Sequence, residues 1–233
     1  MRNQVTDQVR NSIWERVSRR KSLIKIGLAV VAVAALTAYI YHTSVFRPAK
    51  NFHEIDPGKF YRSAQLSKDE FAETVKKYGI RTVVNLRGSQ PGEWWFDDEK
   101  DVLGQMGVKL ENIGFSTEQM QTKEDWARYA EILKTAERPI LVHCRSGADR
   151  TSEASAVYVM GYMGKTKAEA LDQLSIKYLH VSLFIPAKNV FIENYGGLDW
   201  LLTNYDPCQQ PFRPYAKNES HCPPPDPGRV AGQ

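Results

Sequence analysis

The chain has 233 residues, 42% hydrophobic and 25% charged, which suits one ordinary domain with appendages and excludes both a disulfide-stapled miniprotein and a many-domain machine. Its positive charge is concentrated at the start, because residues 1–25 carry a net charge of +5 and residues 26–233 a net charge of −1. The main body therefore has no basic surplus of the kind that binds nucleic acid, and we expect no nucleic-acid partner.

The first element is an apolar span. Residues 26–46 contain no Asp, Glu, Lys or Arg, and as a helix they would reach roughly 31 Å, the thickness of a bilayer core. Seven cations precede the span, while only Arg47 and Lys50 follow it closely. The positive-inside bias predicts that residues 1–25 are cytoplasmic and that the rest faces the periplasm, with a single-pass anchor in the inner (cytoplasmic) membrane. A cleaved signal peptide and a buried globular helix are the alternatives, and the long basic segment argues against the first.

Short apolar runs then alternate with amphipathic segments. Strands are expected at 52–55, 59–62, 80–86, 108–113 and 139–143. Helices are expected from the Ser67–Glu70 capping box to Gly79, at 95–106, from Thr122, and at 151–163, 167–175 and 188–203. This alternation predicts an α/β domain over residues 47–206 with a mostly parallel sheet covered on both faces. Residues 207–233 hold seven of the twelve prolines and predict a Pro-rich tail without its own core.

The chemistry concentrates in one loop between an expected strand and an expected helix, with the sequence His-Cys-Arg-Ser-Gly-Ala-Asp-Arg-Thr over residues 143–151. Ligands of α/β sheets bind at the carboxyl ends of strands. A tight loop there turns backbone N–H groups inward as an anion nest, and the next helix adds its positive end. The residues expected to bind the anion are Arg145, Ser146, Gly147, Ala148 and Thr151, together with the planar fork of Arg150.

Cys144 lies at the floor of this cationic cup, where the N–H groups, the helix end and the guanidinium all favour a thiolate. A thiolate beneath a bound phosphate is placed for in-line attack on phosphorus. These residue types predict transfer of a phosphoryl group to cysteine, followed by hydrolysis.

Cys144, the five residues after it, Arg150 and Thr151 resemble the protein tyrosine phosphatase superfamily signature His-Cys-x5-Arg-Ser/Thr. Residues 59–65, 78–87 and 138–144 are similar to segments of compact, dual-specificity-like bacterial phosphatases. The resemblance implies a four- or five-stranded, mostly parallel sheet flanked by helices, and a phosphocysteine mechanism without metal or other cofactor. It also implies that the Thr151 hydroxyl stabilises the thiolate. Members of the superfamily act on phosphoproteins, inositol phosphates or phospholipids.

The general acid is where the chain departs from the family pattern. Relatives often carry an Asp on a mobile loop before the cysteine, but here residues 112–120 offer only Glu118. Some lipid-directed relatives carry Asp at the position of Asp149 and are thought to use it as the acid. We expect Asp149 to be the acid, with Glu118 as the alternative. A salt bridge that braces Arg150 or a neighbouring loop is the structural alternative for Asp149.

Two further pairs of residues have open roles. Arg62 and Arg87 stand at the ends of their respective expected strands and would either widen the cationic rim or form ordinary surface or structural ion pairs. Cys208 and Cys222 close a 15-residue loop in the tail. A disulfide is expected in an oxidising compartment, and two free thiols are the alternative.

The expected topology narrows the substrate. A periplasmic domain does not meet ATP-dependent kinases, whereas phosphorylated lipids are abundant at that membrane face. A tethered enzyme also gains effective concentration towards substrates in the same plane. We therefore predict a membrane-anchored phosphomonoesterase whose substrate is a membrane lipid phosphate, such as a lipid A phosphate or phosphatidylglycerophosphate. The alternatives are a protein tyrosine or dual-specificity phosphatase and, less favoured because Cys144 and Arg150 are both present, a non-catalytic phosphate-binding module.

Overall fold

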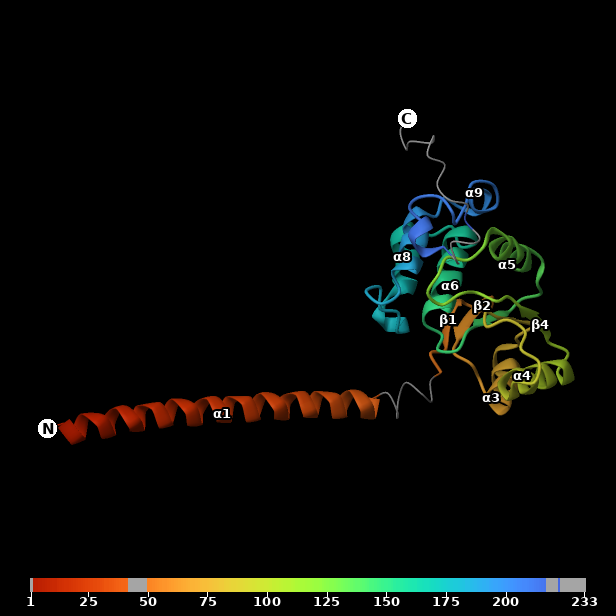
Figure 1. Cartoon of the computed structure of the whole chain (residues 1–233). Helices are drawn as coiled ribbons and strands as arrows, with labels where there is room; N and C mark the ends of the chain where they lie inside the picture. The colour runs from red at the N-terminus through yellow and green to blue at the C-terminus, as the bar shows by residue number, and fades with distance from the viewer. Residues whose placement is uncertain (1, 42–49, 217–221, 223–233) are drawn as a thin grey trace, which may run out of the picture. The chain divides into compact units, whose positions relative to one another are not determined.

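The computed structural model describes residues 2–41, 50–216 and 222, which belong to two compact units divided between Ala49 and Lys50 (Figure 1). The first unit contains one helix, α1 (Arg2–Tyr41), which continues through the basic segment into the apolar span. Within it, Leu23–Ile40 has the length and composition of a membrane-crossing helix, and none of it is buried in protein. The last part of the expected span, residues 42–46, lies outside the described residues.

The second unit is built on a five-stranded sheet. Its strands are β1 (His53–Asp56), β2 (Phe60–Ser63), β3 (Thr82–Asn85), β4 (Lys109–Asn112) and β5 (Ile140–His143). They are arranged in the order β1-β2-β5-β3-β4, with β1 antiparallel to β2 and all other pairs parallel. Ser63 and Asn85 both pair with His143, so three parallel strands end together at one edge of the sheet. The predicted α/β class with a mostly parallel sheet is confirmed.

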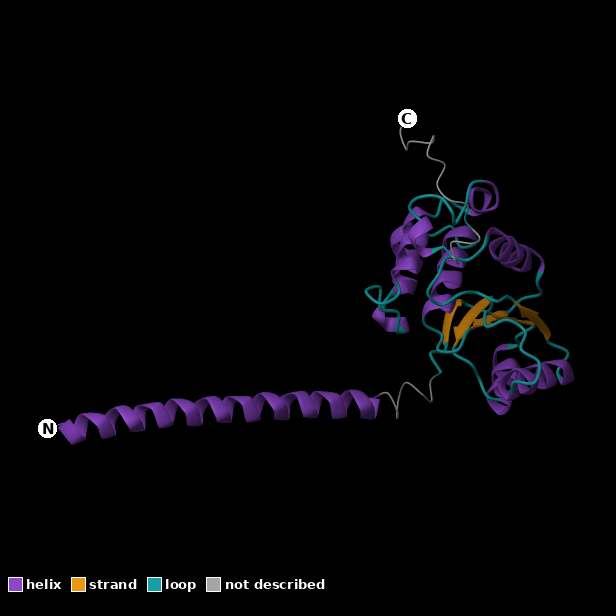
Figure 2. Ribbon diagram, viewed as in Figure 1, coloured by secondary structure: helices purple, strands orange, loops and turns teal. Residues whose placement is uncertain are grey.

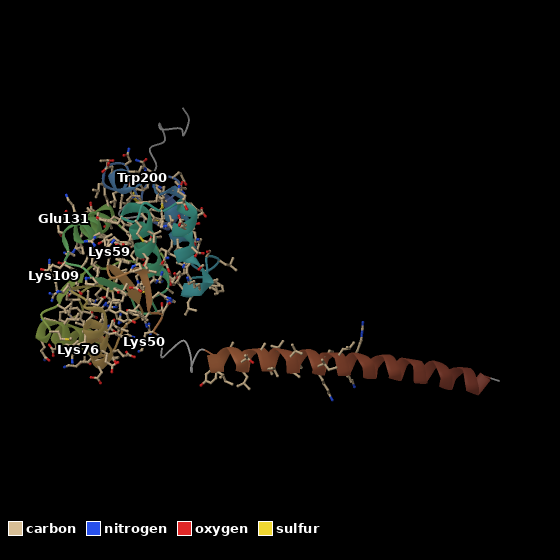
Figure 3. The ribbon with its side chains drawn as sticks, turned by 180° about the vertical axis from the view of Figure 1, so that it is seen from behind. Lys50, Lys59, Lys76, Lys109, Glu131 and Trp200 are labelled. Carbon is tan, nitrogen blue, oxygen red and sulfur yellow. A yellow bond between two sulfur atoms is a disulfide. The ribbon has the colours of Figure 1, made fainter. Side chains whose placement is uncertain are left out.

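Helices cover both faces of this sheet (Figure 2). One face packs on α3 (Lys68–Tyr78) and α4 (Trp94–Gln105). On the other face lie α5 (Lys123–Thr135) and α6 (Asp149–Gly161), and α6 contacts β2 and β5 directly. Outside them, α7 (Lys167–Leu171) and α8 (Pro186–Asn194) pack on α6, and α9 (Leu198–Thr203) packs on α5. Successive strand residues point to opposite faces. Val83 and Leu141 pack in the core on the side of α3 and α4, whereas Val84 and Val142 pack in the core on the side of α5 and α6. Lys76 on α3 and Trp200 on α9 mark opposite ends of the unit in Figure 3.

Local sequence signals set several helix ends. Ser67 accepts from the Glu70 amide and Glu70 bonds back to the Ser67 amide, which forms the expected capping box of α3. Thr122 and Asp125 form the same reciprocal pair at α5. Helix α3 ends at Gly79, whose left-handed φ of 65° closes the last turn.

The single helix expected over residues 188–203 is wrong, because the chain forms α8 and α9 with a break between them. Gly197 has a φ of +106°, and a Cβ on Gly196 would lie 2.7 Å from Trp200 Cγ. The pair of glycines therefore allows a sharp turn before α9 and lets the Trp200 side chain of α9 pack directly on the backbone of Gly196. The helix expected at 167–175 is similarly shortened to α7 plus a 3-10 turn, Asp172–Leu174.

The described part of the C-terminal segment packs onto the second unit. Phe212 is buried in the core beside Phe191, and the Met120 amide donates to the Tyr215 carbonyl at 2.7 Å. Cys208 and Cys222 form a disulfide, so the two thiols are not free. The predicted tail thus contributes an aromatic residue to a core that it could not build alone. Residues 217–221 and 223–233 lie outside the described residues.

We expect Cys222→Ser to lower the free energy of unfolding by about 3 kcal/mol, since the disulfide closes a 15-residue loop. Urea denaturation of the full chain in detergent measures this loss, and dithiothreitol should reproduce it in the wild type. Cys144→Ser is the matched control, because it removes the third cysteine without opening the loop. An unchanged unfolding midpoint after reduction would show that the disulfide adds no stability.

Candidate active site

The phosphate loop, residues 144–148, joins buried strand β5 to α6 at the sheet edge where three strands end. The Cys144 side chain is buried, with 1% of its surface exposed, whereas Arg145 and Ser146 are exposed. Gly147 has a φ of +68°, and a Cβ there would lie 2.8 Å from the backbone of Ser63 and Ala64. Glycine is therefore required both for the turn and for the close approach of the loop to the end of β2.

Arg62 on β2 holds the loop from beneath. Its fully buried guanidinium donates to the Gly147 carbonyl and to Ser152 Oγ, the latter at 2.9 Å, and lies 4.0 Å from the Tyr178 ring centroid. Burial lowers the pKa of Arg62 to about 10, so the group stays charged at neutral pH. Arg62 is thus a support below the loop and does not form part of its rim.

Arg150 and Thr151 carry polar atoms that the protein leaves unsatisfied. Arg150 Nη1 makes one long hydrogen bond, 3.4 Å, to the Leu86 carbonyl. Arg150 Nε and Thr151 Oγ1 are buried and have no hydrogen-bond partner among the described residues. Buried donors without partners are costly and call for an explanation. An oxygen of a bound anion would satisfy Arg150 Nε, and the Cys144 thiolate would accept from the Thr151 hydroxyl.

Arg87 adds positive charge around the loop. Its guanidinium lies 3.2 Å from the centroid of the Trp95 ring, and Nη1 donates to Gln65 Oε1 at 2.8 Å. Burial lowers the pKa of Arg87, and the positive charges of Arg150 and Arg145 lower it further. Three guanidiniums therefore repel one another at the mouth of the site, an arrangement that a dianionic phosphate would relieve.

A buried pair that the sequence analysis missed supports the start of the loop. His143 Nε2 lies 2.9 Å from Glu99 Oε1, and both side chains are fully buried. Glu99 Oε2 accepts from Gln65 Nε2 at 2.9 Å, which links the pair to Arg87. The signal was available: Glu99 stands on the buried face of α4, four residues after Trp95 and four before Leu103.

Asp149, the expected acid, is engaged by a neighbouring loop. Asp149 Oδ1 lies 2.8 Å from His180 Nδ1, and His180 Nε2 lies 2.8 Å from Asn189 Oδ1. The contact matches the bracing that was the structural alternative, with His180 as the partner. The pairing does not bury the group fully, since 18% of the Asp149 side chain is exposed.

Glu118, the alternative acid, is exposed on a loop that is fixed at several points. The buried Lys188 ammonium donates to the Gln119 carbonyl at 2.7 Å and pairs with Glu153 at 3.1 Å. Gln121 donates to the same Glu153 carboxylate at 2.9 Å. Sequence reasoning missed this cluster, although Lys188 shares the buried face of α8 with Phe191 and Ile192.

The described residues contain no group of three or more His, Cys, Asp or Glu side chains that could hold a metal ion. Buried Cys144 lies in the loop that follows a parallel strand, and the next helix begins with two buried donors, Arg150 Nε and Thr151 Oγ1, that are unpaired among the described residues. A cysteine and such donors at the end of a parallel strand are typical of a cysteine phosphatase of the phosphate-loop type.

Comparison with known proteins specifies the class. Residues 40–182 match the family model described as "DSP-PTPase phosphatase fused to NAD+ Kinase", and the chain belongs to this family, within the protein tyrosine phosphatase superfamily. The predictions of the superfamily and of a cysteine-based phosphatase are thereby confirmed.

Relatives with curated functions include an inositol diphosphatase, DSP2, from Oryza sativa subsp. japonica, which is 28% identical over 157 residues (65% of this chain and 72% of the relative). The dual specificity protein phosphatase TpbA of Pseudomonas aeruginosa is 27% identical over 129 residues, so the chain spans about half of TpbA (54% of each). The TpbA crystal structure has a TM-score of 0.53 at 22% identity, covering 66% of this chain and 90% of that one. The catalytic core of the PP-IP phosphatase Siw14 from S. cerevisiae has a TM-score of 0.52 at 22% identity, covering 62% and 85%. These likenesses support the fold.

Gly147→Ala should weaken binding of the phosphate analogue vanadate by at least about tenfold, because the new Cβ meets backbone as well as an unfavourable φ. Inhibition of nitrophenyl phosphate hydrolysis measures the affinity. Gly164→Ala is a matched control, since Gly164 has a φ of +65° but no atom within 4 Å of a Cβ. It should cost about 1 kcal/mol of stability and leave vanadate affinity unaltered. Equal losses of affinity in the two variants would contradict the close-approach argument.

Proposed function

We propose that this phosphatase hydrolyses a membrane lipid phosphate through a phosphocysteine intermediate. In the first step the Cys144 thiolate attacks phosphorus while the Arg150 fork and the backbone N–H groups of residues 145–148 hold the other oxygens. The Thr151 hydroxyl donates towards the sulfur. The bond to the leaving oxygen breaks, and Asp149 protonates that oxygen. Water then attacks the phosphocysteine, Asp149 accepts its proton, and inorganic phosphate leaves with the thiolate restored.

Asp149 is the better candidate for the acid because of where each carboxylate lies. Asp149 begins α6, directly after the phosphate loop, and keeps part of its surface accessible. Glu118 would have to move together with Gln119, whose carbonyl is bound by the buried Lys188. Moving it would break a hydrogen bond to a charged donor, which costs about 1.5–3 kcal/mol.

One surface feature carries the lipid assignment. The loop from Ile176 to Phe184 exposes three large apolar side chains: Ile176 (72%), Leu183 (83%) and Phe184 (75%). In the described residues 50–216 the other exposed large apolar side chains are Trp94 and Leu202. The loop is bound to the phosphate loop, because Asn51 donates to the carbonyls of both Tyr178 and Ser146 and because His180 contacts Asp149. Apolar side chains gathered beside a phosphate site suit an acyl chain or a membrane interface.

The α1 helix supports a substrate within the membrane. Leu23–Ile40 has the features of a membrane-crossing helix, and the charges before it favour a cytoplasmic N-terminus with the phosphatase unit in the periplasm. Tethering would confine the enzyme to the plane that holds its substrate. A reporter fused after Gln233 tests this orientation, since a cytoplasmic signal would overturn it and would favour phosphoprotein substrates.

Asp149→Asn should lose roughly 10²–10⁴-fold in rate on a lipid or alkyl phosphate, because their leaving oxygens must be protonated. On nitrophenyl phosphate the loss should be far smaller, since nitrophenolate departs readily as an anion. Steady-state phosphate release from both substrates measures the difference. Glu118→Gln is the matched control and should not discriminate between them. If Glu118→Gln shows the leaving-group dependence instead, the acid is on the upstream loop.

The substrate is tested by phosphate release from the full chain reconstituted in vesicles containing phosphatidylglycerophosphate or lipid A phosphate. Leu183→Ser with Phe184→Ser should reduce this release by about tenfold or more, since each exposed side chain would bury apolar area worth about 1.5–3 kcal/mol. Hydrolysis of soluble nitrophenyl phosphate should not change. Leu202→Ser, an exposed leucine on α9, is the matched control, and Cys144→Ser sets the background.

Two outcomes of the same screen would replace the lipid by another substrate. TpbA has been solved in complex with pTyr, so a phosphotyrosine peptide belongs in the screen. DSP2 is an inositol diphosphatase and Siw14 a PP-IP phosphatase, so an inositol pyrophosphate belongs there too. A preference for either over both lipids, unaffected by Leu183→Ser with Phe184→Ser, would refute the lipid assignment while leaving the phosphocysteine chemistry intact.

A further inference from the structure

His180 is a buried histidine with a hydrogen-bond partner on each ring nitrogen. It follows the 3-10 turn Ile176–Tyr178, and 2% of its surface is exposed. Nδ1 lies 2.8 Å from Asp149 Oδ1, and Nε2 lies 2.8 Å from Asn189 Oδ1 on α8. The imidazole is therefore held between the start of α6 and the first turns of α8, in contact with the residue proposed as the acid.

The two contacts determine how many protons the group holds. A neutral imidazole has one N–H and one bare nitrogen, and a carboxylate can only accept. Asn189 Oδ1 is an acceptor, so the Nε2 proton lies there. Nδ1 and Asp149 Oδ1 can then approach to 2.8 Å only with one proton between them. The pair is an imidazolium beside a carboxylate or a neutral imidazole beside a carboxylic acid, and both forms carry the same proton.

The charges around the pair come from α6 and α8. The charge of His180 lowers the pKa of Glu153, and the charge of Asp149 raises the pKa of Lys188. Glu153 and Lys188 are themselves joined at 3.1 Å, so their charges largely cancel. Burial raises the pKa of Glu153 and lowers the pKa of Lys188, while each partner's charge opposes the shift. Arg150, next to Asp149 in the chain, adds a positive charge. These charges do not themselves hold the proton on the pair, so the two short contacts of His180 must do so.

We propose that His180 is a positioning residue that keeps on Asp149 the proton delivered to the leaving oxygen. The inference rests on the proposed role of Asp149 as the acid. As the S–P bond to Cys144 forms, the P–O bond breaks, and the leaving oxygen keeps the electron pair and takes the proton from the Asp149 carboxyl. A neutral His180 beside an ionised Asp149 remains. When water attacks phosphorus and the S–P bond breaks, the water returns one proton to the pair.

Replacing His180 by Asn distinguishes two roles of the side chain: holding a proton for Asp149 and holding the Asp149 carboxyl in place by a hydrogen bond. The Asn amide can still donate to Asp149 from near the Nδ1 position, but it cannot titrate. A lone aspartic acid ordinarily loses its proton near pH 3.9, whereas an imidazole loses its proton near 6.5. The alkaline limb of the pH–rate profile on an alkyl phosphate should therefore move to lower pH by at least about one unit. At pH 7 the alkyl phosphate rate should fall by about 10- to 100-fold, and the nitrophenyl phosphate rate by much less.

Controls distinguish the possible failures. His53→Asn removes a half-buried histidine that touches Tyr178 in the same loop but does not contact Asp149, and it should keep the wild-type pH profile. Vanadate affinity of His180→Asn reports an intact phosphate loop. Should that variant not fold, Asn189→Leu removes the Nε2 acceptor and should shift the limb in the same direction. An unshifted limb in His180→Asn with wild-type vanadate affinity would leave His180 a brace only and overturn the inference. If Asp149→Asn itself shows no leaving-group dependence, the proposed acid fails first.

Discussion

The site depends on one buried charge, the guanidinium of Arg62. Placing a cation where no surface is exposed is unfavourable unless its donors are satisfied. The two terminal nitrogens of Arg62 meet this condition, Nη1 with Gln173 and Nη2 with Gly147 and Ser152, whereas Nε has no hydrogen-bond partner among the described residues. The Tyr178 ring lies over the guanidinium. These partners come from the phosphate loop, α6 and the two 3-10 turns, so one group on β2 holds together segments that are far apart in sequence. With a pKa of about 10 it also keeps a positive charge beneath Cys144, with which it interacts.

Two polar networks, one on each side of the sheet, fix the two ends of the phosphate loop. Towards α4, His143 precedes the nucleophile and is bound to Glu99. Gln65 donates a hydrogen bond to Glu99 and accepts one from Arg87. Towards α8, Asp149 follows the loop and is bound to His180. Each network is at least partly buried, so neither end of the loop can shift without leaving polar groups unpaired. Donors that are already in place need no reorganisation when charge develops on the phosphoryl oxygens, which is the basis of electrostatic catalysis.

Local signals made much of the fold and the loop predictable. The reciprocal caps at Ser67 and Thr122 and the short β-branched run of β3 depend on neighbours in the chain, which the sequence displays. The partners of Glu99, Lys188 and His180 could not be read in this way, because each joins elements far apart in sequence. Phe212 shows the same limit. It lies in a segment whose Pro-rich composition is typical of a tail, and its burial depends on a core that other segments form. Two adjacent glycines, Gly196 and Gly197, are a local signal for the break that the expectation of one helix over residues 188–203 did not use.

The proposed position of the acid, Asp149, rests on which parts of the site are held in place. The loop that carries Glu118 is bound to α8 by Lys188, to α6 by Gln121 and Glu153, and to the disulfide-bonded segment by the Met120 amide. Releasing these ties would leave a buried ammonium without its carbonyl partner, so closure of that loop would be expensive. An acid at the start of α6 avoids that cost, because it is fixed to the helix that carries Arg150. With the proposed acid at Asp149, the nucleophile, the anion site and the acid share one strand–loop–helix element.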